Sequence, residues 1–395
     1  MTMAEIGATE KGGSCRLALT DLDRQARDLF VGWCEEAGCT VTVDAMGNIF
    51  ARRAGRDESR PPVVSGSHLD IQPTGGKFDG VYGVLAALEV IRTLNDHGYE
   101  TDAPVEAAVS TNEEGSRFAP AMTASGVFAG HFDLAFAHGL TDPDGKMLGE
   151  ELARIGYLGE GACGGRPLGA FFEAHIEQGP VLEAEGKTIG VVTGAQGQRW
   201  FEITLVGMEA HAGTTPMPRR HDALVGAASL VTAAHEIALA QPPLAVATVG
   251  MVEVKPNSRN TIPGSVFLTV DLRHPEDATL ATMAAELRRA CEAACATQEL
   301  EARFEEIAYT SPVSFDPGCV DTVRRAAADA GYGHRDIVSG AGHDACYIAK
   351  VAPTAMVFVP CADGISHNEI ESATPEDLAA GCNVLLQAML DHAGK

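Results

Sequence analysis

Five short segments, far apart in the chain, carry side chains of the kind that bind metal ions, and any fold of this sequence must account for them. They are residues 66–70, 77–80, 112–115, 174–178 and 366–369. Histidine and carboxylate ligands together suit zinc, or an ion softer than magnesium such as manganese or cobalt. Only a folded domain can bring such distant segments together. The sequence therefore predicts one binuclear metal site assembled from remote parts of the chain.

Length, charge and cysteine usage limit the class of protein. A chain of 395 residues is long for one hydrophobic core, so two domains are expected. The net charge of −25 disfavours nucleic acid and anionic membranes as partners, because both attract Lys and Arg. The N-terminus lacks a secretory signal, and no apolar run reaches the roughly 18 residues of a membrane span. With 10 dispersed cysteines and no CxxC pair, a cytoplasmic protein with reduced thiols is predicted.

The first half of the chain alternates between strand-like and helix-like segments. A β-branched run at 62–68 precedes an apolar helix at 81–94, and a second strand is predicted at 104–110. A ligand segment follows each of these two strands. This alternation predicts an α/β fold with its chemistry at the carboxyl ends of the strands.

The pattern changes near residue 197, where alternation of apolar and polar residues indicates a strand with one exposed face. The order strand, helix, strand, strand, helix, strand follows, which is the split βαβ unit. The predicted segments are 199–206, 222–240, 245–254, 265–272, 277–296 and 302–309. We therefore expect a discontinuous metal-binding domain, residues 1–197 and 313–395, with a second domain, residues 198–312, inserted into it.

The local chemistry assigns candidate roles at the strand ends. His68 and Asp70 lie two residues apart, so one can bind metal while the carboxylate of the other accepts the spare imidazole N–H. The adjacent Glu113 and Glu114 diverge, so one can bind metal while the other moves protons. Asp79 follows glycines that permit the close approach a bridging ligand needs, although taken alone it would more often be a helix N-cap.

The same segments resemble the M20 metallopeptidase superfamily, in particular its hydantoinase/carbamoylase branch. Matching stretches span nearly the whole chain, at residues 66–70, 75–80, 113–118, 175–179, 209–217, 339–345 and 366–369. The branch contains N-carbamoyl-L-amino acid amidohydrolases, β-ureidopropionases and allantoate amidohydrolases. The resemblance implies a catalytic α/β domain with a mixed central sheet and an inserted ferredoxin-like (βαββαβ) domain that mediates dimerisation and acts as a lid.

The resemblance also implies a ligand set for two divalent ions, zinc first, with manganese, cobalt or nickel as alternatives. One ion would be held by His68, Asp79 and His175. The other would be held by Asp79, Glu114 and His367, with Asp79 as the bridge. Glu113 would be the general acid/base, and Asp70 is counted with the catalytic residues as the partner of His68.

Four further residues are implied to act on the substrate. His211 would stabilise the oxyanion in a neighbouring subunit's site, which predicts a homodimer. Gln178 would contact the ureido or carboxylate end of the substrate. Asn260 and Arg273 of the insert would hold the carboxylate, for which the arginine fork is well suited. The alternatives are a surface histidine at 211 and a strand-end ion pair between Arg273 and Asp271.

The predicted activity is hydrolysis of the ureido C–N bond of an N-carbamoyl amino acid, which gives the free amino acid, ammonia and carbon dioxide. β-Ureidopropionase and allantoate amidohydrolase activities are alternatives within the branch, and N-acyl amino acid deacylase or exopeptidase activity is another on the same scaffold. A ligand-binding protein without turnover is the alternative from a different class. Ile71, where many relatives carry threonine, borders the site and is expected to tune substrate choice.

Overall fold

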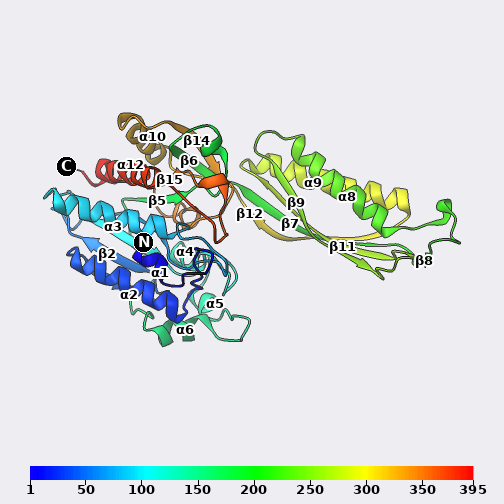
Figure 1. The fold of residues 1–395 in the computed structure, drawn as a ribbon, viewed down its shortest axis with the longest axis horizontal. Coiled ribbons are helices and arrows are strands. Elements are labelled where there is room, and N and C mark those ends of the chain that lie inside the picture. The colour runs from blue at the N-terminus through cyan, green and yellow to red at the C-terminus, as the bar shows by residue number, and fades with distance from the viewer. Residues whose placement is uncertain (395) are drawn as a thin grey trace. The chain divides into compact units, whose positions relative to one another are not determined.

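The computed structural model describes residues 1–394. Its contacts divide the chain into two compact units, Met1–Gly194 with Ser314–Lys395, and Ala195–Val313 (Figure 1). Among the described residues, no helix is both long enough and apolar enough to cross a membrane.

The first unit is built on a mixed sheet in the order β1-β2-β4-β3-β5-β15-β6-β13, with β14 paired to β6. Neighbours β4, β3, β5 and β15 are parallel, whereas β1, β2 and β6 pair antiparallel. This confirms the expected mixed α/β sheet. The strands are β1 (Thr40–Val43), β2 (Ile49–Arg53), β3 (Val63–His68), β4 (Val105–Ser110), β5 (Ala170–Ile176), β6 (Ile189–Ala195), β13 (Val313–Ser314), β14 (His334–Ser339) and β15 (Thr354–Val359).

The central strands β3, β5 and β15 are buried at every residue, as expected for strands covered on both faces. Helices α3 and α12 pack against each other and against these strands (Figure 1). The helices of this unit are α1 (Thr2–Glu5), α2 (Asp21–Glu36), α3 (Val81–Asp96), α4 (Thr123–Phe128), α5 (Leu134–His138), α6 (Leu148–Ile155), α7 (Val181–Ala184), α10 (Pro317–Asp329), α11 (Asp344–Ile348), η2 (Ala362–Gly364) and α12 (Pro375–Ala393).

Helix boundaries follow local capping chemistry. Thr20 accepts the backbone N–H of Asp23 at the start of α2, and Thr374 accepts that of Asp377 at the start of α12, where Pro375 occupies the first turn. The parallel strands have their carboxyl ends at one edge of the sheet, with His68 of β3 in register with Ser110 of β4. The ligand segments that follow them therefore start from the same edge.

The second unit has the predicted βαββαβ order, which confirms the ferredoxin-like expectation. Its sheet runs β12-β7-β11-β9 and is antiparallel throughout. β11 alternates between half-buried and buried residues, and its buried side chains meet both helices in one core. The elements are β7 (Gly197–Val206), β8 (Ala210–His211), η1 (Met217–Arg219), α8 (Ala223–Leu239), β9 (Val246–Lys255), β10 (Thr261–Ile262), β11 (Ser265–His274), α9 (Asp277–Gln298) and β12 (Glu301–Thr310).

Candidate metal centre

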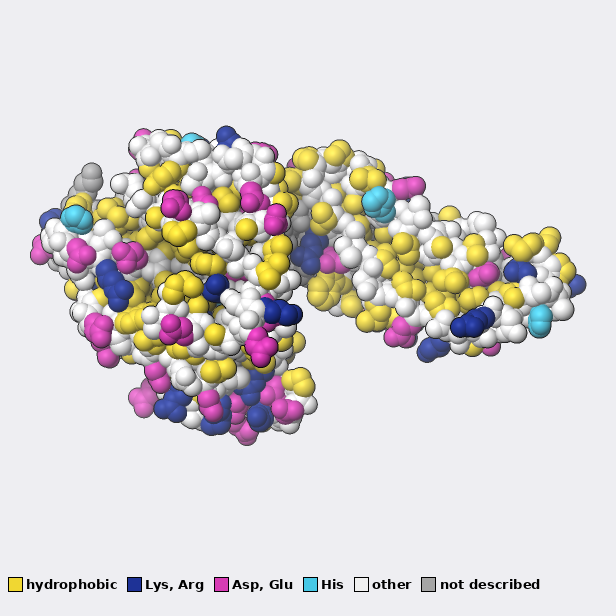
Figure 2. All heavy atoms as spheres, viewed as in Figure 1, with side chains coloured by type: hydrophobic (Ala, Val, Ile, Leu, Met, Phe, Trp, Pro, Cys, Tyr) yellow, Lys and Arg dark blue, Asp and Glu magenta, His cyan; other side chains and the backbone are white. Residues whose placement is uncertain are grey.

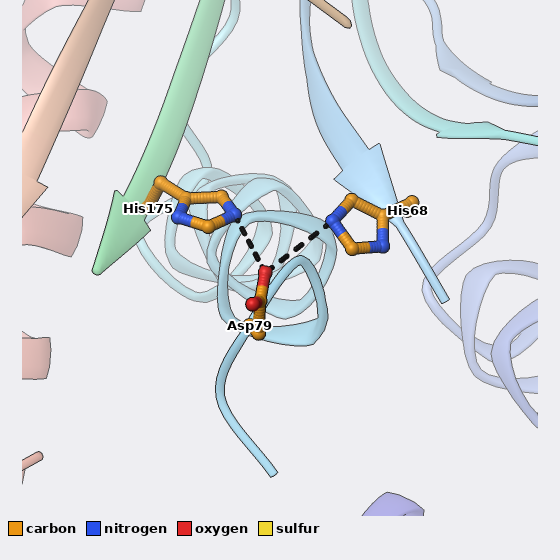
Figure 3. A group of neighbouring side chains, drawn as sticks. All are labelled: His68, Asp79 and His175. Atoms are coloured by element: carbon orange, nitrogen blue, oxygen red, sulfur yellow. Dashed lines mark ion pairs between the residues drawn. The ribbon is translucent and has the colours of Figure 1, made fainter. Parts of the chain in front are cut away.

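His68, Asp79 and His175 converge from three different elements of the first unit (Figure 3). His68 ends β3, His175 lies in β5, and Asp79 precedes α3. Nε2 of His175 lies 3.1 Å from Asp79 Oδ1, and Nε2 of His68 lies 3.5 Å from the same oxygen. All three side chains are buried. The structure thus brings together the first predicted ligand group.

Backbone carbonyls set the orientation of both imidazole rings. Nδ1 of His68 lies 2.8 Å from the carbonyl oxygen of Asp70, and Nδ1 of His175 lies 2.9 Å from that of Ile176. A carbonyl oxygen only accepts hydrogen bonds, so each Nδ1 carries a proton and each ring turns its Nε2 toward Asp79. Two imidazole nitrogens that converge on one carboxylate oxygen form a donor set that fits a divalent metal ion.

Gly80 makes the close approach of the two segments possible. A Cβ atom at this position would lie 2.3 Å from Cε1 of His68, and the backbone has a φ of +66°. Its N–H also points at Nε2 of His175, at 3.2 Å. The glycine after Asp79 is therefore required both for space and for a left-handed backbone.

Asp79, Glu114 and His367 form a second group on the other side of Asp79. Nε2 of His367 lies 3.4 Å from Asp79 Oδ2 and 3.5 Å from Glu114 Oε2. Glu114 Oε1 is buried and has no hydrogen-bond partner among residues 1–394. Asp79 therefore directs one oxygen to each group, which is the arrangement that a bridging carboxylate needs.

The electrostatics of the centre are dominated by burial and by charges close together. Burial raises the pKa of the Glu114 carboxyl to about 7, and Asp79 contributes to the shift. Burial also acts to raise the pKa of Asp79, but hydrogen bonds from three histidines outweigh it and hold that pKa well below its ordinary value. The bridging position thus strongly favours the ionised carboxylate.

Glu113 lies beside the first group. Its Oε2 is 3.5 Å from Nε2 of His68, and the residue is 7% exposed. Burial raises the pKa of its carboxyl well above the ordinary value, although the nearby His68 opposes the shift. A carboxyl group in this position can exchange a proton with a molecule bound at the centre.

The predicted contact between the Asp70 carboxylate and His68 is wrong, because the acceptor is the backbone carbonyl of Asp70. The carboxylate instead accepts the backbone N–H groups of Glu113 and Glu114, at 3.3 and 3.1 Å. These amides leave the end of β4 without a strand partner, so a buried carboxylate is needed to satisfy them. Asp70 therefore fixes the backbone from which the two glutamates diverge.

Gln178 belongs to the metal centre. Its Nε2 donates to Asp79 Oδ2 at 2.8 Å and to Ser366 Oγ at 3.2 Å. Its Oε1 is buried and, within residues 1–394, has no hydrogen-bond partner. The residue has a φ of +57°, a conformation that is uncommon for a side chain of this kind and typical of functional sites. One acceptor at the centre is thus left for a ligand.

His211 and Asn260 lie together in the second unit. His211 in β8 pairs with Thr261 in β10, and the carbonyl of Asn260 accepts the N–H of Ala212 at 2.9 Å. Nδ1 of His211 accepts the N–H groups of Gly213 and Thr214, at 3.0 and 3.3 Å. The ring proton therefore resides on Nε2, which makes this exposed histidine a hydrogen-bond donor.

Arg273 does not lie with Asn260, contrary to the expectation that they hold one carboxylate together. β10 lies just before the start of β11, whereas Arg273 is near the end of β11, roughly 27 Å along the strand from Ser265 at about 3.4 Å per residue. The guanidinium forms an ion pair with Asp271, at 2.8 Å. Within one copy of this unit the two side chains cannot contact the same small molecule.

Sequence reasoning left Glu173 and His343 without a role. Glu173 lies two residues before His175 on the same face of β5, and it accepts Ser67 Oγ at 2.6 Å and the N–H of Ala345 at 2.9 Å. The His343 ring lies 4.6 Å from that of His175. These residues form a third group of metal-type side chains, but both Glu173 oxygens already accept hydrogen bonds. For Glu173, the period of two along the strand was the available signal.

A His/carboxylate cluster at the strand ends of an α/β domain is typical of metal-dependent hydrolases. Residues 64–391 match the model of Peptidase family M20/M25/M40, and the chain belongs to this family.

Individual relatives match over most or all of this chain. The chain is 51% identical to an N-carbamoyl-L-amino-acid amidohydrolase of Rhizobium meliloti, covering 100% of this chain and 94% of the relative. It is 34% identical to a ureidoglycolate hydrolase of Arabidopsis thaliana, covering 94% of this chain and 80% of the relative. The crystal structure of a hydantoinase/carbamoylase family amidase from Burkholderia multivorans matches with a TM-score of 0.98 and 66% identity, covering 100% of this chain and 96% of that one.

Proposed function

We propose that this protein hydrolyses the ureido C–N bond of an N-carbamoyl amino acid and releases the free amino acid, ammonia and carbon dioxide. The observation that carries the proposal is the pair of ligand groups sharing Asp79, with Glu113 beside them. The N-carbamoyl-L-amino-acid amidohydrolase relatives support this substrate class. The ureidoglycolate hydrolase relatives keep other ureido compounds as alternatives, among them β-ureido acids and allantoate.

The residues divide the chemistry between them. His68, Asp79 and His175 would hold one divalent ion, and Asp79, Glu114 and His367 the other. We propose zinc, with manganese, cobalt or nickel as alternatives, because the donors are imidazole and carboxylate. Such ions acidify a bound water and polarise a carbonyl group. Glu113 would take a proton from the attacking water and deliver it to the leaving nitrogen.

Substrate recognition would use groups on both units. The unpartnered Oε1 of Gln178 would accept an N–H of the ureido group. Arg273 would exchange Asp271 for the substrate carboxylate, which matches the planar arginine fork. His211, with its proton on Nε2, would donate to the developing oxyanion. Because Asn260 lies beside His211 and far from Arg273, we propose that His211 and Asn260 come from a partner subunit.

The second unit offers a surface on which such a partner can bind. β9 is the edge strand of its sheet and pairs only with β11 among the described strands. Next to it, α8 exposes Leu224, Ala228 and Val231 along one stripe. Hydrophobic side chains are widespread on this unit in Figure 2. An open strand edge beside an apolar helix suits pairing with a second copy, so we propose a homodimer.

Charge placed in the α8 stripe should separate the dimer. Val231→Asp would bury an unpaired carboxylate in the interface and is expected to weaken association at least about 10²-fold. Sedimentation velocity against protein concentration measures this. Ala285→Asp, at an exposed position of α9, is the matched control and should remain dimeric. A Val231→Asp variant that stays dimeric would exclude this surface as the interface.

A substrate panel tests the activity itself. Ammonia release should be fastest with N-carbamoyl-L-amino acids and slower with N-carbamoyl-β-alanine and allantoate, each assayed after reconstitution with zinc, manganese or cobalt. Release of an acyl group from N-acetyl amino acids, with no ammonia from any ureido compound, would instead establish a deacylase.

We also propose a cytoplasmic location, which rests on the 10 dispersed cysteines of the sequence.

A further inference from the structure

Glu371 is a buried carboxylate next to the metal centre that the proposed mechanism does not use. It is 2% exposed and lies in the loop before α12. Its Oε1 accepts the backbone N–H groups of Phe78 and Asp79, at 2.9 and 3.1 Å. A Cβ atom on Gly76 would lie 2.0 Å from this same oxygen. The loop carrying Asp79 is therefore wrapped around the carboxylate of Glu371.

The second oxygen of Glu371 reaches Asp79 through a side chain. Ser366 Oγ lies 2.9 Å from Glu371 Oε2 and 3.0 Å from Asp79 Oδ2. The hydroxyl also accepts the amide of Gln178, at 3.2 Å. A serine hydroxyl has one proton, so the two carboxylates are alternative acceptors for it. Asp79 can thus give up this hydrogen bond without leaving the hydroxyl unsatisfied.

We propose that Glu371 is the positioning residue of the metal centre, which holds Asp79 between the two ligand groups through the Asp79 backbone and through Ser366. Glu371 is not assigned as a ligand, because it belongs to none of the clustered ligand groups and its Oε1 accepts two backbone N–H groups. If Asp79 gave up this hydrogen bond to hold an ion, the Ser366 hydroxyl would donate to Glu371 Oε2 instead. The proposal rests on the metal centre of the proposed function and not on the identity of the substrate.

Zinc affinity of the substrate-free protein tests this role. The metal-stripped wild type and the variants Glu371→Ala, Glu371→Gln and Ser366→Ala are titrated with zinc against a chromophoric chelator. We expect Glu371→Ala and Ser366→Ala to bind zinc about 10- to 100-fold more weakly, the range found when groups behind metal ligands are removed. Glu371→Gln should recover most of the affinity, because its amide oxygen can still accept both N–H groups and its NH₂ can donate to Ser366.

Asp44 provides the matched control. It is also a buried carboxylate that accepts two backbone N–H groups, those of Met46 and Asn48 at 2.8 and 3.0 Å, but it anchors the turn between β1 and β2. Asp44→Ala should lower the melting temperature and leave zinc affinity unchanged.

Zinc binding by Glu371→Ala and Ser366→Ala with wild-type affinity would overturn the positioning role. If Glu371→Ala does not fold, Ser366→Ala and Glu371→Gln still decide the question. Since no substrate enters the titration, failure of the ureido assay would leave this result standing, and the reverse also holds.

Discussion

Replacing Glu113 by glutamine is expected to lower kcat by about 10²- to 10⁴-fold, the usual contribution of a positioned general acid/base. The amide keeps the size of the side chain but cannot accept and pass on a proton. Glu113 belongs to neither group of clustered ligand atoms, so the metal content should remain near that of the wild type. Steady-state ammonia release together with elemental analysis of the purified variant measures both quantities.

The neighbouring residue is the control for this experiment. Glu114→Gln changes the same chemical group one position along the chain, but Glu114 clusters with Asp79 and His367. It should therefore lose bound metal as well as activity. Substantial activity in Glu113→Gln would remove Glu113 from the proton-transfer role, and loss of its metal would make it a ligand instead.

A heterodimer made from two inactive variants should regain about half of the wild-type activity if each site is completed by the partner. One subunit carries Glu113→Gln and the other His211→Ala. The subunit with His211→Ala keeps its own Glu113 and receives an intact His211 from its partner, so one of the two sites is complete. Each homodimeric variant is expected to be lower by about 10²-fold or more, since His211 would supply an oxyanion donor.

The heterodimer is isolated by two affinity tags, and its ammonia release is compared with that of each homodimer. The control is a heterodimer of a wild-type subunit and a subunit with the double substitution Glu113→Gln/His211→Ala. Both substitutions then lie on one subunit instead of on two. If His211 is supplied by the partner subunit, each of the two sites in this control heterodimer lacks either Glu113 or His211. The activity of the control should therefore stay low. Recovery in this control, with none in the first heterodimer, would show that His211 acts within its own subunit.

The ligand segments and much of the element order were predictable because their signals are local, although no strand or helix was predicted between residues 111 and 196. His68, Glu114 and their counterparts follow apolar runs that identify buried strands, and parallel strands end at one edge of a sheet. The inserted unit was predictable for a similar reason, since its strand alternation and helical stretches each depend on neighbouring residues. The roles within the site came from the family resemblance and not from the spacing.

Contacts between side chains and remote backbone were not predictable in the same way. The spacing of His68 and Asp70 suggested a carboxylate–imidazole pair, but the turn after β3 presents the carbonyl of Asp70 to the ring and its carboxylate to the β4 loop. The contacts of Glu371 were not predictable from the sequence, because the backbone N–H groups that its carboxylate accepts lie almost 300 positions earlier in the chain. The sequence separation from Phe78 is 293 residues.

The sequence by itself determined the chemical inventory of this protein and the order of its strands and helices, because residue type and periodicity are local properties. The tertiary structure decided which groups meet. It placed Asp79 between two clusters, brought Asn260 into contact with Ala212 next to His211, and separated both from Arg273 along β11. These outcomes depend on strand register and on the hydrogen bonds that buried backbone groups must find, and neither is encoded within a single segment.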